Sequence, residues 1–186
     1  CSKFVKENKY IQLINLKKNS GVSLARNAGI NFSKGTYIFF LDSDDLIINK
    51  TLIKINKMIE KNIFLDFAFF PSYDPINKIK DNNYLNYKKK NKGFINCIND
   101  YQNFRLTCWN YLYNRDFLLR NNIKFSNIRI FEEQIFLTKV FIQAKKYKIF
   151  TIPLYLRRIL QVNSLSSKVG NDLILCCIKN INELIK

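Results

Sequence analysis

Residues 36–45, TYIFFLDSDD, decide which fold this sequence can adopt. The first six residues are mostly aromatic and aliphatic, which favours a buried strand. Three carboxylates then follow within four positions, at Asp42, Asp44 and Asp45. Like charges held this close repel and raise one another's pKa unless a cation or hydrogen-bond donors offset them. A strand that delivers them to its exposed tip therefore predicts a functional site.

The segment before this strand indicates an α/β fold. Residues 10–16 alternate apolar and polar side chains, which predicts a strand, and a helix is expected from Ser20 or Ser23 to about Phe32. A strand, a helix and a strand in this order form a β-α-β unit with parallel strands. Ligands bind such open sheets beyond the carboxyl ends of the strands, where residues 42–45 lie.

The remaining chain alternates helical and extended patterns. Apolar periodicity predicts helices at residues 49–61, 94–104, 115–121, 131–146 and 172–185, and strands at residues 63–70, 109–113, 147–152 and 154–159. Residues 72–92 are polar and rich in Lys and Asn, so we expect a loop there, or a weak hairpin around residues 84–87.

Composition narrows the class of protein. The chain has 186 residues, 47% of them hydrophobic, which suffices for one domain with a buried core. Residues 63–70, the longest apolar stretch, are far short of the roughly 20 residues that cross a bilayer. No secretory signal pattern opens the sequence, so we expect a cytoplasmic protein. Five cysteines without a C-x-x-C pair and the lack of histidine exclude a Cys/His zinc site.

The formal net charge is +17, which attracts phosphates on nucleotides, nucleic acid or anionic lipid. The sign of the charge does not choose among these partners. Lys, Asn and Ile are all abundant, and AT-rich coding produces the same bias without selection for binding.

The triplet Asp42-Ser43-Asp44 is the first candidate site, because its spacing places two carboxylates on the same side of a strand tip. Carboxylate oxygens are the ligands that Mg²⁺ and Mn²⁺ prefer, and such ions are usually held by one or two carboxylates and substrate phosphates. The alternative is structural, since Asp also caps turns and helices.

Three further groups have two interpretations each. Arg26 either offers a bidentate fork to phosphate or carboxylate, or faces solvent. Glu132 and Glu133 either stabilise the positive end of a helix dipole or supply a general base that takes a proton from a hydroxyl group. Arg157 and Arg158 either pair with phosphates or guard a sheet edge by charge.

Taken in order, these segments resemble the family 2 glycosyltransferases of the GT-A fold, inverting enzymes that build bacterial surface polysaccharides. The matching segments are NSGVSLARNAG (19–29), GTYIFFLDSDD (35–45), WNYLYNRD (109–116), FEEQIF (131–136) and PLYLRRILQVNSLSS (153–167). The resemblance covers nearly the whole chain.

For the fold, the resemblance implies an α/β protein with a GT-A (Rossmann-like) mixed sheet flanked by helices. Residues 1–70 would form the donor-binding half of a single partial domain, and residues 71–186 the acceptor half with a C-terminal helix. Family members open with a strand, a helix and a second strand that ends in Asp-Asp-Gly-Ser, which this sequence does not contain. We therefore expect a sheet that lacks its first β-α-β portion.

For the site, the resemblance implies a Mn²⁺ or Mg²⁺ ion bound by Asp44 and Asp42, with Asp44 as the direct ligand. The family usually has a Glu-Asp pair where this chain has Glu132-Glu133. Glu133 then corresponds to the catalytic base, and Glu132 stays the alternative. The residues expected to bind substrate are Asn19, Gly21, Arg26, Asp42, Trp109 and Arg157.

For the function, the resemblance implies inverting, metal-dependent transfer of a sugar from a nucleotide-sugar, a UDP-sugar first of all, to a bacterial cell-surface glycan or lipid-linked acceptor. The alternatives are a truncated, catalytically inactive relic and a basic protein that binds phosphates or a membrane surface. Residues 88–92 could contact the inner face of the cytoplasmic membrane. We do not expect a nucleic-acid partner.

Overall fold

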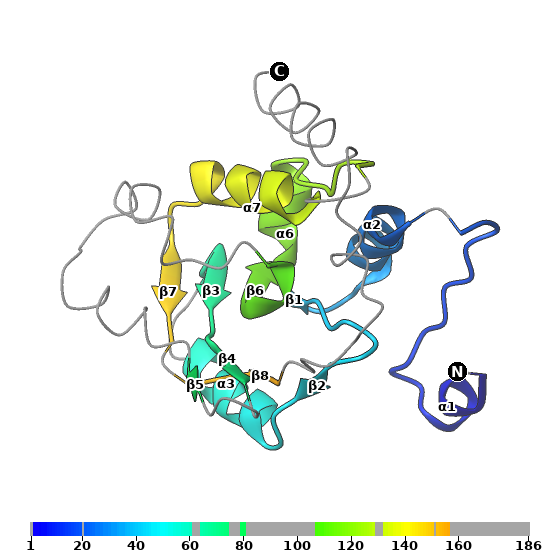
Figure 1. Cartoon of the computed structure of the whole chain (residues 1–186), viewed down its shortest axis with the longest axis horizontal. Coiled ribbons are helices and arrows are strands. Elements are labelled where there is room, and N and C mark those ends of the chain that lie inside the picture. The colour runs from blue at the N-terminus through cyan, green and yellow to red at the C-terminus, as the bar shows by residue number, and fades with distance from the viewer. Residues whose placement is uncertain are drawn as a thin grey trace.

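A mixed four-stranded sheet forms the centre of the protein (Figure 1). The computed structural model describes residues 2–19, 21–60, 64–74, 79–80, 107–128, 132–150 and 152–156. The strand order is β1-β6-β3-β7, with bounds Tyr37–Phe39, Tyr111–Asn114, Phe67–Phe69 and Tyr147–Ile149. β6 is antiparallel to both of its neighbours, whereas β3 and β7 are parallel.

A second sheet lies at the end of the first and has the order β2-β8-β4-β5 (Figure 1). Its strands are Leu46–Ile47, Tyr155–Leu156, Ser72–Asp74 and Ile79–Lys80. β8 is antiparallel to β2 and parallel to β4. The acidic residues 42–45 lie between β1 of the first sheet and β2 of the second, so both sheets fix the ends of this loop.

Helices cover the two faces of the central sheet. One face packs against α2 (Val22–Phe32), α6 (Arg115–Arg120) and α7 (Glu132–Gln143), and the other packs against α3 (Thr51–Glu60). The strands alternate accordingly: Phe67 and Phe69 belong to the first core, while Ala68 lies in the second. This arrangement confirms the predicted α/β architecture with a mixed sheet flanked by helices.

Several predicted elements are confirmed at nearly their predicted bounds. The helices α2, α3, α6 and α7 all form, and the side chain of Asn114 caps α6 by accepting a hydrogen bond from the backbone N–H of Phe117 at 2.9 Å. The segment predicted as extended at residues 109–113 begins with a short 3₁₀ helix, η2 (Cys108–Asn110), and continues as β6. The predicted strands at 63–70, 147–152 and 154–159 contain β3, β7 and β8.

The predicted strand at residues 10–16 is wrong, and so is the parallel β-α-β unit built on it. These residues form no strand and extend away from the sheets, with α1 (Ser2–Glu7) at their far end (Figure 1). Tyr10 is 84% exposed. Alternation indicates which side of a strand would be buried, but a strand also needs a neighbour with free hydrogen-bonding groups. β1 pairs with β6 instead.

Some predictions concern residues outside the described ranges. These are the hairpin around residues 84–87 and the helices at 94–104 and 172–185. β4 and β5 do form an antiparallel pair within the predicted loop, next to its first proline. In the part of the chain that the structure describes, no helix has the length and hydrophobicity required to span a membrane.

The aromatic core beneath α7 yields a test of the fold. Phe136 is fully buried and its ring stacks on that of Phe125 with centroids 4.0 Å apart. We expect Phe136→Ala to lower the free energy of unfolding by about 3–5 kcal/mol, because the lost contacts leave a cavity. Urea denaturation followed by circular dichroism measures this change.

Ile142→Ala is the matched control, since Ile142 lies on the same helix and is 62% exposed. It should change the free energy of unfolding by no more than about 0.5 kcal/mol. Equal losses in the two variants would contradict the packing described for α7.

Candidate active site

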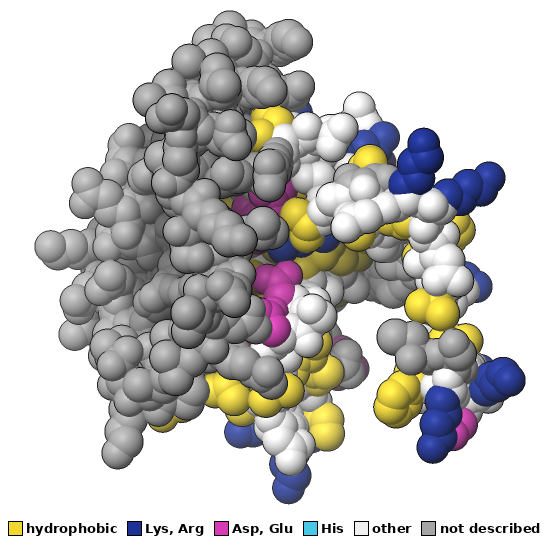
Figure 2. Space-filling view, turned by 45° about the vertical axis from the view of Figure 1, so that its right-hand side comes forward, with side chains coloured by type: hydrophobic (Ala, Val, Ile, Leu, Met, Phe, Trp, Pro, Cys, Tyr) yellow, Lys and Arg dark blue, Asp and Glu magenta, His cyan; other side chains and the backbone are white. Residues whose placement is uncertain are grey.

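The guanidinium group of Arg26 brings together three carboxylates from two other parts of the chain. Its Nη1 lies 2.9 Å from Oε1 of Glu132, and its Nη2 lies 3.0 Å from Oδ1 of Asp42 and 3.3 Å from Oε1 of Glu133. Only 11% of the Arg26 side chain is exposed. Figure 2 shows acidic side chains gathered near the middle of this face of the molecule. Four residues proposed from the sequence thus form one cluster.

The position of Arg26 follows from how α2 is held against the residues that precede α7. The side chain of Asn27 donates a hydrogen bond to the backbone carbonyl of Phe125 and accepts one from its N–H, each at 2.9 Å. The guanidinium of Arg26 also lies 5.3 Å from the centre of the Phe125 ring, a favourable cation–π arrangement. Asn27 therefore fixes the helix that carries Arg26.

Two residues predicted to bind the donor shape the start of the same helix. The N–H of Gly21 donates to Oδ1 of Asn19 at 3.3 Å, and Gly21 has a φ of 84°, a left-handed conformation that glycine adopts without strain. Both residues are exposed. The structure gives them a role in the turn before α2 and does not join them to the carboxylate cluster.

Glu132 and Glu133 form the first turn of α7, where the helix dipole favours negative charge. That structural explanation and the functional one hold together, because both side chains also contact Arg26. Glu133 makes a further contact with η2: its Oε1 accepts hydrogen bonds from the thiol of Cys108 at 3.0 Å and from the backbone N–H of Cys108 at 3.4 Å.

The pKa values of Glu133 and Arg26 are both raised in the cluster, but for different physical reasons. Burial raises the pKa of Glu133; Arg26 and Cys108 oppose this shift, and Glu132 and Asp42 add to it. Burial alone would lower the pKa of Arg26, but Cys108, Glu133 and Asp42 raise it above its usual value. Arg26 therefore stays charged, and Glu133 is a stronger base than an exposed glutamate.

The acidic loop is held from the second sheet by Tyr155 in β8. The phenol O–H of Tyr155 donates to Oδ2 of Asp45, and the backbone N–H of Asp42 donates to the phenol oxygen at 3.4 Å. Burial and the bond to Asp45 raise the pKa of Tyr155, which keeps the phenol protonated as a donor. The ring of Trp109 stacks on that of Tyr155, with centroids 4.3 Å apart. Trp109 therefore joins the site through Tyr155.

The carboxylates of Asp42 and Asp44 are the groups of this loop that could hold a divalent ion, whose remaining ligands would be phosphates of the substrate. Asp42 keeps 35% of its side chain exposed, and Asp44 forms no hydrogen bond or ion pair with any residue that the structure describes. The same described residues hold no cluster of three or more His, Cys, Asp or Glu suited to a metal. Mg²⁺ and Mn²⁺ at nucleotide sites take one or two protein carboxylates and substrate phosphates, which matches this pair.

The sequence predicted most of this cluster and missed two of its members. Arg26, Asp42, Glu132 and Glu133 meet as described, whereas Arg157 lies outside the described residues. The missed members are Tyr155 and Cys108. Tyr155 stands in the segment PLYLRR but carries no local signal of its contact with the loop, and a cysteine without partners in sequence indicates only a small buried side chain.

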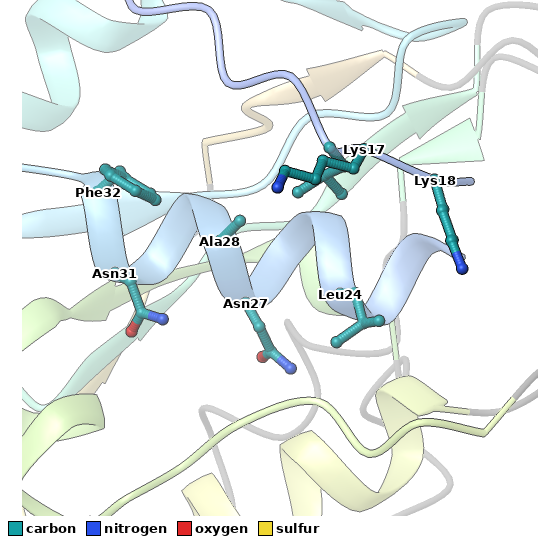
Figure 3. A pocket seen from close by; sticks show the side chains of 8 residues that line it. Lys17, Lys18, Leu24, Asn27, Ala28, Asn31 and Phe32 are labelled. Carbon is teal, nitrogen blue, oxygen red and sulfur yellow. The ribbon is translucent and has the colours of Figure 1, made fainter. Parts of the chain in front are cut away.

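A hollow of about 470 Å³ lies along α2 and is lined by this helix and by the segment that precedes it (Figure 3). Its lining contains no acidic side chain and is formed by Leu16, Lys17, Lys18, Leu24, Asn27, Ala28, Asn31 and Phe32. It offers no general base and no carboxylate ligand, so we place the candidate active site at the cluster around Arg26.

Comparison with known proteins agrees with these observations. The sequence model of "Glycosyl transferase family 2" matches residues 1–131, which is more than half of the chain. One relative is the poly(ribitol-phosphate) beta-N-acetylglucosaminyltransferase TarP of Staphylococcus aureus, 31% identical over 73% of this chain and 41% of that protein. Another is the minor teichoic acid biosynthesis protein GgaA of Bacillus subtilis, 28% identical over 79% of this chain and 33% of that protein.

Solved structures show the same fold. The crystal structure of S. aureus TarS residues 1–349 in complex with UDP-GlcNAc superposes with a TM-score of 0.69 at 17% identity, covering 96% of this chain and 53% of that one. The chain therefore spans about half of that structure, and less than half of the two relatives.

The shared cation yields a test of the cluster. Arg26→Gln should lower the free energy of unfolding by up to about 3–5 kcal/mol at neutral pH, because it leaves partly buried carboxylates without their counter-charge. Arg26 holds down the pKa of Glu133, so in the variant that pKa rises further above 4.5. A carboxyl group whose pKa is raised by folding costs stability as the pH rises, so the loss should be larger at pH 8 than at pH 5.

Arg120→Gln is the matched control, because Arg120 is exposed at the end of α6 and its Nε, among the described residues, donates to the backbone carbonyl of Asp116. We expect a change within about 0.5 kcal/mol at either pH. If Arg26→Gln lowered the free energy of unfolding equally at pH 5 and pH 8, the ionisation of the carboxylates would not depend on Arg26. Urea denaturation at both pH values measures the difference.

Proposed function

Since this chain belongs to glycosyl transferase family 2, we propose that it transfers a sugar from a nucleotide-sugar donor to a cell-surface glycan acceptor, with inversion at the anomeric carbon. The observation that carries this proposal is the contact of Arg26 with both Asp42 and Glu133. It places an acidic loop suited to a metal and a diphosphate beside a buried carboxylate suited to a proton transfer.

The larger number of contacts and the greater exposure of Glu133 favour it over Glu132, whose Oε1 contacts Arg26, as the base. Oε1 of Glu133 receives all of the contacts described for this carboxylate, from Arg26 and from the thiol and N–H of Cys108. None of the described residues contacts Oε2, and we propose this oxygen as the one that accepts the proton. The side chain of Glu133 is also the more exposed of the two, 20% against 11%. In the proposed reaction Glu133 takes the proton of the acceptor hydroxyl as its oxygen bonds to the anomeric carbon.

The leaving group departs from the other side of the sugar. Asp44 and Asp42 would hold a Mn²⁺ or Mg²⁺ ion together with the diphosphate of the donor. When bound, the ion supplies positive charge that stabilises the departing nucleoside diphosphate. Tyr155 keeps the acidic loop in place through Asp45 and the N–H of Asp42. A single displacement of this kind inverts the configuration at the anomeric carbon.

The relatives support a donor and an acceptor class. The TarS structure contains UDP-GlcNAc, which supports a UDP-sugar as the donor here. The names of TarP and GgaA refer to poly(ribitol-phosphate) and teichoic acid, which supports a cell-surface polymer as the acceptor. We propose that the reaction takes place in the cytoplasm, and beside the membrane where the acceptor is lipid-linked, since nucleotide-sugars are cytoplasmic substrates.

Glu133→Gln tests the base. Gln keeps the size of the side chain but cannot accept the proton, so kcat should fall by a factor of about 10²–10⁴ while UDP binding stays unchanged. In the wild-type protein kcat/KM should rise with pH through the raised pKa of Glu133, above 4.5, and this rise should be absent from the residual activity of the variant. Release of UDP from UDP-sugars in the presence of glycan acceptors measures both.

Glu60→Gln is the control, because Glu60 is exposed at the end of α3 and accepts a hydrogen bond from Asn56. Its activity should equal that of the wild type. If Glu132→Gln abolished transfer while Glu133→Gln retained it, the two glutamates would exchange roles.

Asp44→Ala tests the metal. We expect wild-type protein to bind UDP in the presence of Mn²⁺ or Mg²⁺ and to lose this binding in EDTA, because the diphosphate then meets uncompensated carboxylates. Asp44→Ala should weaken UDP binding at least tenfold, as measured by isothermal titration calorimetry. Asp116→Ala, an exposed aspartate on α6, serves as the control and should bind as the wild type does. Equal affinity for UDP in EDTA and in the presence of Mn²⁺ or Mg²⁺ would contradict the proposed role of the metal.

A further inference from the structure

We propose that Cys108 is a positioning residue for the general base: its thiol and backbone N–H hold Oε1 of Glu133 and leave Oε2 to take the acceptor proton. This inference rests on the proposed function, because it concerns the same carboxylate. No sequence motif indicates a cysteine at this site, since a buried cysteine usually acts as a small apolar side chain.

The contacts of Glu133 converge on one oxygen. Sγ of Cys108 lies 3.0 Å from Oε1, the backbone nitrogen of Cys108 lies 3.4 Å from it, and Nη2 of Arg26 lies 3.3 Å from it. These donors come from two elements of the chain, η2 and α2. A carboxylate held by one oxygen through several donors cannot rotate freely, so the direction of its second oxygen is fixed as well.

Cys108 is itself held rigidly. It is fully buried, and its carbonyl accepts a hydrogen bond from the phenol of Tyr113 at 2.9 Å. Asn110, two positions later in η2, donates from its side chain to the carbonyl of Phe70 at 2.8 Å, and its own carbonyl accepts from the N–H of Phe70 at 2.8 Å. The short helix that carries Cys108 is therefore anchored at the end of β3, next to the centre of the sheet.

The protonation state of the thiol agrees with a donor. Burial first, and then the charge of Glu133, raise the pKa of Cys108 well above its usual value, which keeps the proton on sulfur. The proton can then be donated to Oε1. Among the described residues, the groups that shift the pKa of Glu133 are Arg26 from α2, Asp42 from the loop after β1, Glu132 from its own helix and Cys108 from η2. Of these, Arg26 and Cys108 favour its ionised form. Tyr113 of β6 also interacts with Glu133, whose charge raises the pKa of the Tyr113 phenol.

Cys108→Ala tests the inference against the simpler reading of a side chain that only fills space. Loss of the thiol donor should lower kcat about tenfold, the scale of one hydrogen bond to a charged group, and leave the KM for the donor unchanged. It should also shift the rise of kcat/KM to higher pH, because the thiol lowers the pKa of Glu133. Cys108→Ser, which retains a donor, should restore most of kcat and move the rise back.

Thr107→Val is the matched control, since Thr107 precedes Cys108 and its hydroxyl donates to Asn110, at 2.6 Å, and not to Glu133. It removes a neighbouring hydroxyl and should leave the pH profile unmoved. In the Glu133→Gln background, Cys108→Ala should cause little additional loss of kcat, because both changes act through one carboxylate. If Cys108→Ala and Cys108→Ser had equal kcat values and equal pH profiles, the positioning role would be overturned.

A titration that needs no turnover separates this inference from the proposed function. Carboxyl-carbon NMR of Glu133 in the wild-type protein, Cys108→Ala and Thr107→Val follows the pKa of the carboxyl group directly. We expect an upward shift in Cys108→Ala alone. If the wild type transfers sugar but this pKa does not move, only the role of Cys108 falls; if the wild type transfers no sugar under any condition, the proposed function falls and the role of Cys108 in it falls too.

Discussion

The charge of Arg26 is the constraint on which the site depends. Asp42, Glu132 and Glu133 approach one another only because a buried guanidinium contacts all of them, at distances of 2.9–3.3 Å. Buried ion pairs of this kind seldom add much net stability, because removing the charges from water costs about as much as their attraction returns. Two hydrogen bonds between the side chain of Asn27 and the backbone of Phe125, together with the ring of Phe125, nevertheless hold Arg26 there. Such an arrangement is better explained by chemistry than by stability.

The two sheets position the remaining groups of the site around Arg26. β1 ends at one side of the acidic loop and β2 begins at the other, while Tyr155 of β8 holds the loop between them. α7 packs its apolar side chains on the central sheet and so places its first turn at the same point. The hydrophobic core therefore determines where the carboxylates lie, and Arg26 determines that they can remain ionised together.

Sequence reasoning succeeded where the physical signal is local. The helical patterns of α2 and α7 and the change from apolar to acidic at the tip of β1 are properties of consecutive residues. It failed where the outcome depends on a distant partner. β1 is paired with β6, far along the chain, and residues 10–16 have the alternation of a strand without forming one. The contact of Cys108 with Glu133 is likewise tertiary, and no sequence pattern near Cys108 predicts it.

The charge count of the cluster bears on how a donor could enter it. One guanidinium against three carboxylates leaves two negative charges when all three are ionised, and Asp44 adds another beside them. The chain as a whole carries +17, so the protein attracts phosphates while its candidate active site repels them. A nucleoside diphosphate would meet that local repulsion at short range unless a divalent cation accompanied it. If the proposed function holds, the long-range field and the local cluster would together favour a diphosphate already paired with a metal ion over either component alone.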